Sequence, residues 1–209
     1  MADEMDFELD PNDLIKAVKK NIKKGLGDFE DIINLDSSFD REIIIGDIDY
    51  GFGLSVDGII RFWNKYDDIH NIPIEERKPI KLIIDSCGGS LSDAFTIIDS
   101  IESSTTPVHG ICIGTAYSAG FFIFISCHKR FAYPHASFLF HEGSAGNSGT
   151  AAQFANFAAF YKKQLMQLEQ IVIKHTNITE EDYKEIKKDD VWFDVIDGIE
   201  KGFIEEVIR

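Results

Sequence analysis

Short apolar runs alternate with longer stretches of helical periodicity along most of the chain. Continuous apolar runs at 41–48 (REIIIGDI), 80–85 (IKLIID), 108–114 (VHGICIG) and 136–141 (ASFLFH) predict buried strands. Apolar residues at helical spacing over 53–69, 91–103 and 115–127 predict helices between these strands. This alternation favours an α/β fold in which helices cover a mostly parallel sheet.

The first forty residues follow a different pattern. Leu14, Ile15, Val18 and Ile22 lie at helical spacing within 11–24, which predicts a short amphipathic helix.

The whole chain has 209 residues, 44% of them apolar, which is enough for one substantial core. We therefore expect an N-terminal extension over 1–40 and a single domain over 41–209.

Composition narrows the classes of partner and ligand. The 21 basic and 36 acidic residues give a net charge of −15, which disfavours binding to nucleic acid or to an anionic membrane. The acidic N-terminus is unlike a signal peptide, and no apolar stretch is long enough to span a bilayer, so we expect a cytoplasmic protein. No phosphate-binding loop motif is present, so any coupling to ATP requires a partner.

The three cysteines, Cys87, Cys112 and Cys127, have no metal-ligand spacing. We expect packed thiols, with neither a disulfide framework nor a zinc site. No metal or organic cofactor is predicted for this chain.

Groups able to perform acyl transfer fall where predicted strands end, the edge at which parallel sheets place their functional residues. Gly88 and Gly89 follow the second strand, Ser118 follows the third, and His141 ends the fourth. A serine nucleophile needs a base, a group that orients the base, and N–H donors for the oxyanion. Structural interpretations remain open: a helix-capping serine, a Gly-Gly turn and an ordinary strand-end histidine.

Five segments resemble the Clp protease proteolytic subunit (ClpP) family of serine peptidases. They are IIDSCGGS, ICIGTAYSAG, KRFAYPHA, FLFHEG and the C-terminal HTNITEEDYKEIKKDDVWFDVIDGIEKGFIEEVI, and the likeness covers about residues 41–209, as in a divergent member. The resemblance implies a ClpP/crotonase-like α/β fold with a protruding handle helix. It also implies that KRFAYPHA forms a turn before the histidine strand.

Carried over position by position, the resemblance makes Ser118 the nucleophile, His141 the general base and Asp190 the orienting acid. Spacing alone does not separate Asp190 from other acids near the C-terminus, and only a gap-free match prefers it to Asp189. The backbone N–H groups of Gly89 and Ala119 become the oxyanion hole. No metal takes part.

The resemblance also implies an assembly. GSAGNSGT is expected to form a glycine-rich strand, and the following residues a long helix, in a handle region of about 143–176. This region implies a homo-oligomer of two stacked heptameric rings that hydrolyses peptides and unfolded proteins. An AAA+ unfoldase partner is implied too, although residues 1–40 do not resemble the axial hairpin that engages it.

Several positions depart from the family pattern. Cys87 replaces a usual proline, and Glu142 follows the histidine in place of glutamine. Tyr117 and Ala119 flank the serine where the family usually has small and methionine residues. We hypothesise that Glu142 raises the pKa of His141 or restricts acidic substrates. The alternatives are an acyl-CoA enzyme of the crotonase fold and an inactive ClpP-like scaffold whose triad is misaligned by Tyr117 and Glu142.

Overall fold

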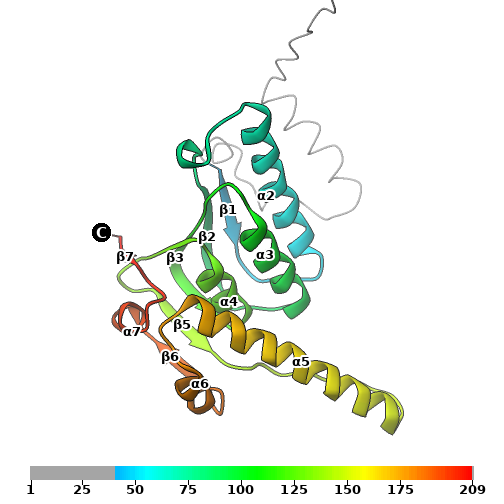
Figure 1. Ribbon diagram of the computed structural model, residues 1–209. Coiled ribbons are helices and arrows are strands. Elements are labelled where there is room, and N and C mark those ends of the chain that lie inside the picture. The colour runs from blue at the N-terminus through cyan, green and yellow to red at the C-terminus, as the bar shows by residue number, and fades with distance from the viewer. Residues whose placement is uncertain (1–40, 209) are drawn as a thin grey trace, which may run out of the picture.

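The computed structural model describes residues 41–208, which form one mixed α/β unit around a seven-stranded sheet (Figure 1). The predicted helix at 11–24 lies outside the described residues. The strands are β1 (Glu42–Ile45), β2 (Ile80–Ser86), β3 (Val108–Tyr117), β4 (Lys129–Ala132), β5 (Ser137–Phe140), β6 (Val191–Phe193) and β7 (Glu206–Val207).

The sheet is parallel apart from one pair. Its main path runs β1-β2-β3-β4-β7, and β5 pairs with the end of β3 that β4 leaves free. Only β5 and β6 are antiparallel. Because β3 pairs with β4 through His109–Cys112 and with β5 through Thr115–Tyr117, its last residues lie beside β5, the strand that His141 follows.

Helices connect these strands. They are α2 (Phe52–Ile69), the 3₁₀ turn η3 (Ile74–Glu76), α3 (Leu91–Ser103), α4 (Ala119–Ser126), α5 (Ala151–His175), α6 (Glu180–Ile186) and α7 (Val195–Glu200). Figure 1 shows α2 and α3 together on one side of the strands, while α5 extends well beyond the sheet. The predicted α/β class with a mostly parallel sheet is confirmed.

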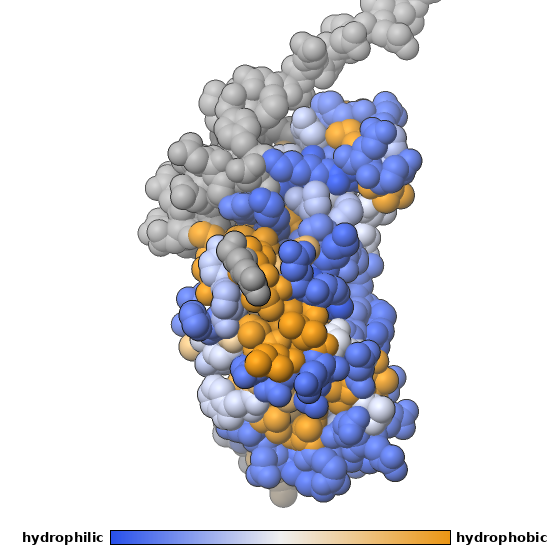
Figure 2. All heavy atoms as spheres, turned by 90° about the vertical axis from the view of Figure 1, so that its left-hand side faces the viewer, coloured by the Kyte–Doolittle hydropathy of each residue, from blue (hydrophilic) through white to orange (hydrophobic). Residues whose placement is uncertain are grey.

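The two faces of the sheet differ in cover. Alternate side chains of β2 are fully buried under the helices, because strand side chains point to opposite faces in turn. On the other face Ile44 and Ile113 remain 43% and 40% exposed. Figure 2 looks at the side away from α2 and α3 and shows a broad hydrophobic area there.

Helix α4 lies at the centre of the core. All eight of its residues are buried, and the rings of Phe121 and Phe122 pack edge-on against Phe140 of β5. Burying one such side chain stabilises a fold by about 1.5–3 kcal/mol. The residue that precedes α4, Ser118, is thus attached to the most deeply packed helix of the molecule.

The handle helix is confirmed as a long element, but the strand expected before it is absent. Helix α5 has 25 residues, and only Leu168 and Val172 are buried. Residues 143–149 form no strand and are exposed. A strand needs a partner for its main-chain groups, and residues 143–149 pair with no other segment of the described chain.

Two strand boundaries also differ from the prediction. Strand β3 continues to Tyr117, three residues beyond the predicted 108–114, and β4 lies within the segment expected to be a turn. Strand β4 has only four residues, and the first two, Lys129 and Arg130, are basic. Short strands of this kind lack the periodic signal on which the prediction rests.

The cysteines are not all packed. Cys112 and Cys127 are buried, and burial raises the pKa of the Cys112 thiol to about 12. Cys87 is exposed in the turn before Gly88, so the expectation of three packed thiols is wrong at this position. None of the helices within 41–208 is both long and apolar enough to cross a bilayer.

Candidate active site

Ser118 lies at a tight turn between β3 and α4. Its backbone has φ 54° and ψ −121°, a conformation that residues other than glycine rarely adopt. The Ser118 N–H donates to the Leu139 carbonyl of β5 at 2.9 Å, so the turn is joined to the neighbouring strand. Unusual backbone conformations of this kind cluster at functional sites.

The side chain of Ser118 does not cap the helix that follows it. No side-chain cap hydrogen bond is present at the start of α4. Instead, the hydroxyl oxygen lies 2.7 Å from Nε2 of His141, within hydrogen-bond distance. The capping interpretation of Ser118 is therefore wrong in this structure.

His141 follows directly on β5, and its second ring nitrogen faces a carboxylate. Nδ1 of His141 lies 3.4 Å from Oδ1 of Asp190, which precedes β6. The antiparallel pairing of Phe140 with Val191 brings these two strand ends together. Of the two neighbouring candidates, Asp190 rather than Asp189 makes this contact, although its side chain is 63% exposed.

The glycine pair lies directly against the serine turn. Gly88 has φ 98°, and a Cβ on it would lie 2.8 Å from the Ser118 Cβ and 3.1 Å from the Ala119 nitrogen. Gly89 has φ 143°, and a Cβ there would lie 2.3 Å from the Ile48 carbonyl oxygen. Both the backbone angles and the close approach require glycine at these two positions.

Ile48 holds this loop in place. Its N–H donates to the Gly88 carbonyl at 2.9 Å, and its carbonyl accepts from the Ser90 N–H at 2.7 Å. Within residues 41–208, the N–H of the intervening Gly89 donates to no other group. The Ala119 N–H is the first of α4, and the first N–H groups of a helix have no partner within it. The N–H groups of Gly89 and Ala119 are thus two donors on residues that line a cavity beside Ser118.

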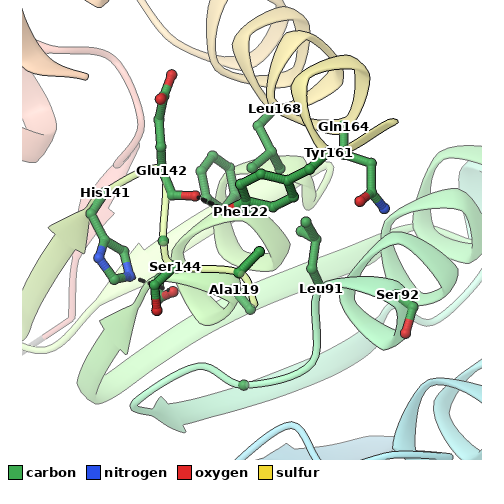
Figure 3. Close-up of a pocket in the computed structure, with 14 residues that line it drawn as sticks. Leu91, Ser92, Ala119, Phe122, His141, Glu142, Ser144, Tyr161, Gln164 and Leu168 are labelled. Atoms are coloured by element: carbon green, nitrogen blue, oxygen red, sulfur yellow. Dashed lines mark hydrogen bonds between the residues drawn. The ribbon is translucent and has the colours of Figure 1, made fainter. Parts of the chain in front are cut away.

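A cavity of about 440 Å³ opens beside the serine and histidine. Figure 3 shows Tyr161 and Leu168 pointing from α5 toward Leu91 and Phe122. These four side chains give the cavity apolar walls, while Gln164 and Ser92 add polar groups. A peptide side chain fits a cavity of this size beside Ser118.

Tyr117 and Glu142, which depart from the family pattern beside the serine and the histidine, have side chains that point away from the site. The Tyr117 hydroxyl lies 2.7 Å from the Ser137 hydroxyl oxygen, and its ring packs edge-on against Trp192. The carboxylate of Glu142 points away from the His141 ring (Figure 3). Neither side chain separates Ser118 from His141, so the geometry does not favour misalignment by these residues.

Sequence reasoning missed Tyr161. Its hydroxyl donates to the main-chain carbonyl of Glu142 at 2.8 Å, which ties α5 to the residue after His141. Burial and the charge of Glu142 raise the pKa of the Tyr161 hydroxyl. No sequence signal marks a side-chain contact with a backbone carbonyl 19 positions away.

The described residues around the cavity do not form a cluster of metal ligands. Residues 41–208 contain no group of three or more histidine, cysteine, aspartate or glutamate side chains placed to hold a metal ion. The groups gathered around the cavity are a hydroxyl, an imidazole, a carboxylate and backbone amides.

Ser118, His141 and Asp190 thus lie in a row at the ends of strands, in the order hydroxyl, imidazole and carboxylate that is typical of serine hydrolases. A sequence model of the Clp protease family matches residues 72–209. The chain belongs to this family.

Curated relatives carry the same family name. The ATP-dependent Clp protease proteolytic subunit 2 of Rhodococcus jostii is 32% identical over 133 residues, which cover 63% of this chain and 68% of the relative. The protein of that name from Corynebacterium glutamicum is 33% identical over 136 residues, covering 63% and 66%. That of Treponema denticola is 29% identical over 137 residues, covering 63% and 67%.

Proposed function

We propose that this chain is a serine endopeptidase in which Ser118 is the nucleophile, His141 the general base and Asp190 the orienting acid. The observation that carries the proposal is the 2.7 Å contact between the Ser118 hydroxyl and Nε2 of His141. Membership of the Clp protease family supports the same reaction class.

The chemistry proceeds by acyl transfer. Ser118 Oγ attacks the peptide carbonyl carbon while its proton passes to Nε2 of His141, and the carbonyl electrons move to oxygen. His141 then gives that proton to the leaving amine as the C–N bond breaks. Water attacks the acyl-enzyme in the same way, its proton passing through His141 back to Ser118 Oγ, and the carboxylic product leaves.

Two neighbours of the pair support this sequence of steps. The Asp190 carboxylate faces the Nδ1–H group of His141 and keeps the proton on that nitrogen, which leaves Nε2 free to accept from serine and stabilises the imidazolium that forms. The N–H groups of Gly89 and Ala119 stabilise the developing oxyanion, and Ala119 adds the positive end of the α4 dipole. No step requires a metal or an organic cofactor.

The same proposal covers substrate and assembly. The apolar cavity suits side chains of peptides and unfolded proteins. Phe154 and Phe160 of α5 are more than half exposed, as is expected of residues that become buried between subunits. We expect stacked heptameric rings, and the name "ATP-dependent" borne by the relatives supports an AAA+ unfoldase partner.

Fluorophosphonate labelling read by intact mass tests the central assignment. The assembled wild-type protein is expected to gain one label per chain, whereas Ser118→Ala and His141→Ala gain none within the same time. Native mass spectrometry of each sample establishes that the assembly is equal. An unlabelled, correctly assembled wild type would sink the peptidase proposal.

A further inference from the structure

The chain that follows His141 has few anchors. After β5 ends at Phe140, residues 142–149 join no strand, and 143–150 are exposed. Ser148 bonds only to its neighbour Asn147. Within residues 41–208, a single hydrogen bond joins the main chain of 142–149 to another element, from the Tyr161 hydroxyl to the Glu142 carbonyl.

Tyr161 is itself well oriented for this contact. Its ring stacks on that of Phe157, one helical turn earlier, with centroids 6.2 Å apart and planes inclined by 10°. A Cβ on Gly143 would lie 3.7 Å from the Tyr161 hydroxyl oxygen, so the hydroxyl also lies close to the residue after Glu142. Figure 3 shows the bond between Tyr161 and Glu142 as a dashed line.

The Glu142 carboxylate does not take part in this anchor. It points away from His141 in Figure 3, and together with burial and Glu169 its charge raises the pKa of Tyr183. The main chain of Glu142, and not its side chain, is therefore the part next to His141 that another element holds.

We propose that Tyr161 is a positioning residue: by binding the Glu142 carbonyl, its hydroxyl fixes the main chain beside His141 and keeps the imidazole aligned with Ser118. The inference rests on the proposed peptidase function. It assigns to the handle helix α5 a direct part in aligning the base. Misplacing a catalytic group by about 1 Å costs as much as a hundredfold in rate, so an anchor one residue from the base matters.

If Tyr161 positions His141, loss of its hydroxyl should slow the chemical step without changing how tightly a ligand is bound. Tyr161 also lines the cavity, so a mere packing role would alter how tightly a ligand is held. Tyr161→Phe removes only the hydroxyl and keeps the ring and its stack on Phe157. The matched control is Tyr50→Phe, because Tyr50 is 95% exposed and does not line the cavity.

The experiment measures fluorophosphonate inactivation over a range of concentrations, which gives a limiting rate constant and a half-saturating concentration. For Tyr161→Phe we expect a limiting rate about three- to tenfold below wild type, matching one hydrogen bond. Half-saturation should change less than about twofold, and the thermal midpoint and oligomer should match those of Tyr50→Phe.

The outcomes are distinct. A limiting rate equal to wild type, or a loss confined to half-saturation, overturns the positioning role while leaving the peptidase proposal intact. Absence of labelling in the wild type itself counts against the peptidase proposal instead.

Discussion

The nucleophile and the base of this site belong to regions of very different packing. Ser118 immediately precedes α4, whose eight residues are all buried, and Gly88 lies against the Ser118 Cβ. His141 follows a four-residue strand and is itself followed by an exposed stretch. Its partner Asp190 is 63% exposed, while the His141 side chain itself is 30% exposed.

The serine side and the histidine side of the site therefore maintain their geometry by different means. On the serine side, dense packing leaves no room for displacement, because close-packed interiors deform little. On the histidine side, alignment depends on single contacts: Tyr161 on the Glu142 carbonyl and Asp190 on Nδ1. We therefore expect substitutions to act sharply on the first side and gradually on the second.

The largest effect is expected from Gly89→Ala. The added Cβ would lie 2.3 Å from the Ile48 carbonyl oxygen at a φ of 143°, so the loop beside Ser118 must shift. We expect the labelling rate to fall at least about a hundredfold, as for a displaced catalytic group.

Gly146→Ala is the matched control on the other side. A Cβ at Gly146 meets nothing within 4 Å, so labelling should stay within about twofold of wild type. Equal effects of the two substitutions, measured as labelling rates, would remove the contrast between the two sides.

Asp190→Asn is expected to have an intermediate effect. The asparagine amide offers Nδ1 of His141 a donor in place of an acceptor, which favours the tautomer that cannot accept from Ser118. Since the contact is 3.4 Å long and exposed, we expect a loss of about 10- to 100-fold, smaller than for a buried acid.

Asp189→Asn should label at the wild-type rate, because Asp190 and not Asp189 faces the imidazole. If Asp189→Asn is the slower variant, the assignment of the acid moves by one residue. Both rates come from the same intact-mass time course.

The two sides also differ in how far the sequence predicts them. Strand β2 can be recognised in the sequence because its buried face carries Ile80, Leu82 and Ile84, with Ile83 between them. The glycine pair, Ser118 and His141 follow apolar runs of this kind and were therefore found. Asp190 lies among many exposed acids, so only the family resemblance pointed to it.

Other features have no local signal at all. The contact of Tyr161 with a carbonyl depends on where α5 lies in space, which periodicity does not specify. The prediction of a glycine-rich strand was wrong for a related reason. A strand is defined by its pairing partner, and residues 143–149 have none among the described residues.

The smallest effect is expected from Thr150→Ala at the start of α5. Thr150 and Gln153 form a reciprocal capping box, and beyond it the first turns of α5 are exposed. Loss of the cap should cost about 1 kcal/mol locally and speed amide hydrogen exchange of residues 151–155, with labelling of Ser118 changed less than about twofold. Ser148→Ala, two residues earlier and outside the box, should leave exchange in α5 unchanged. A large fall in labelling for Thr150→Ala would mean that the start of α5 governs the base as strongly as Tyr161 does, and that the exposed side of the site is as tightly coupled as the buried one.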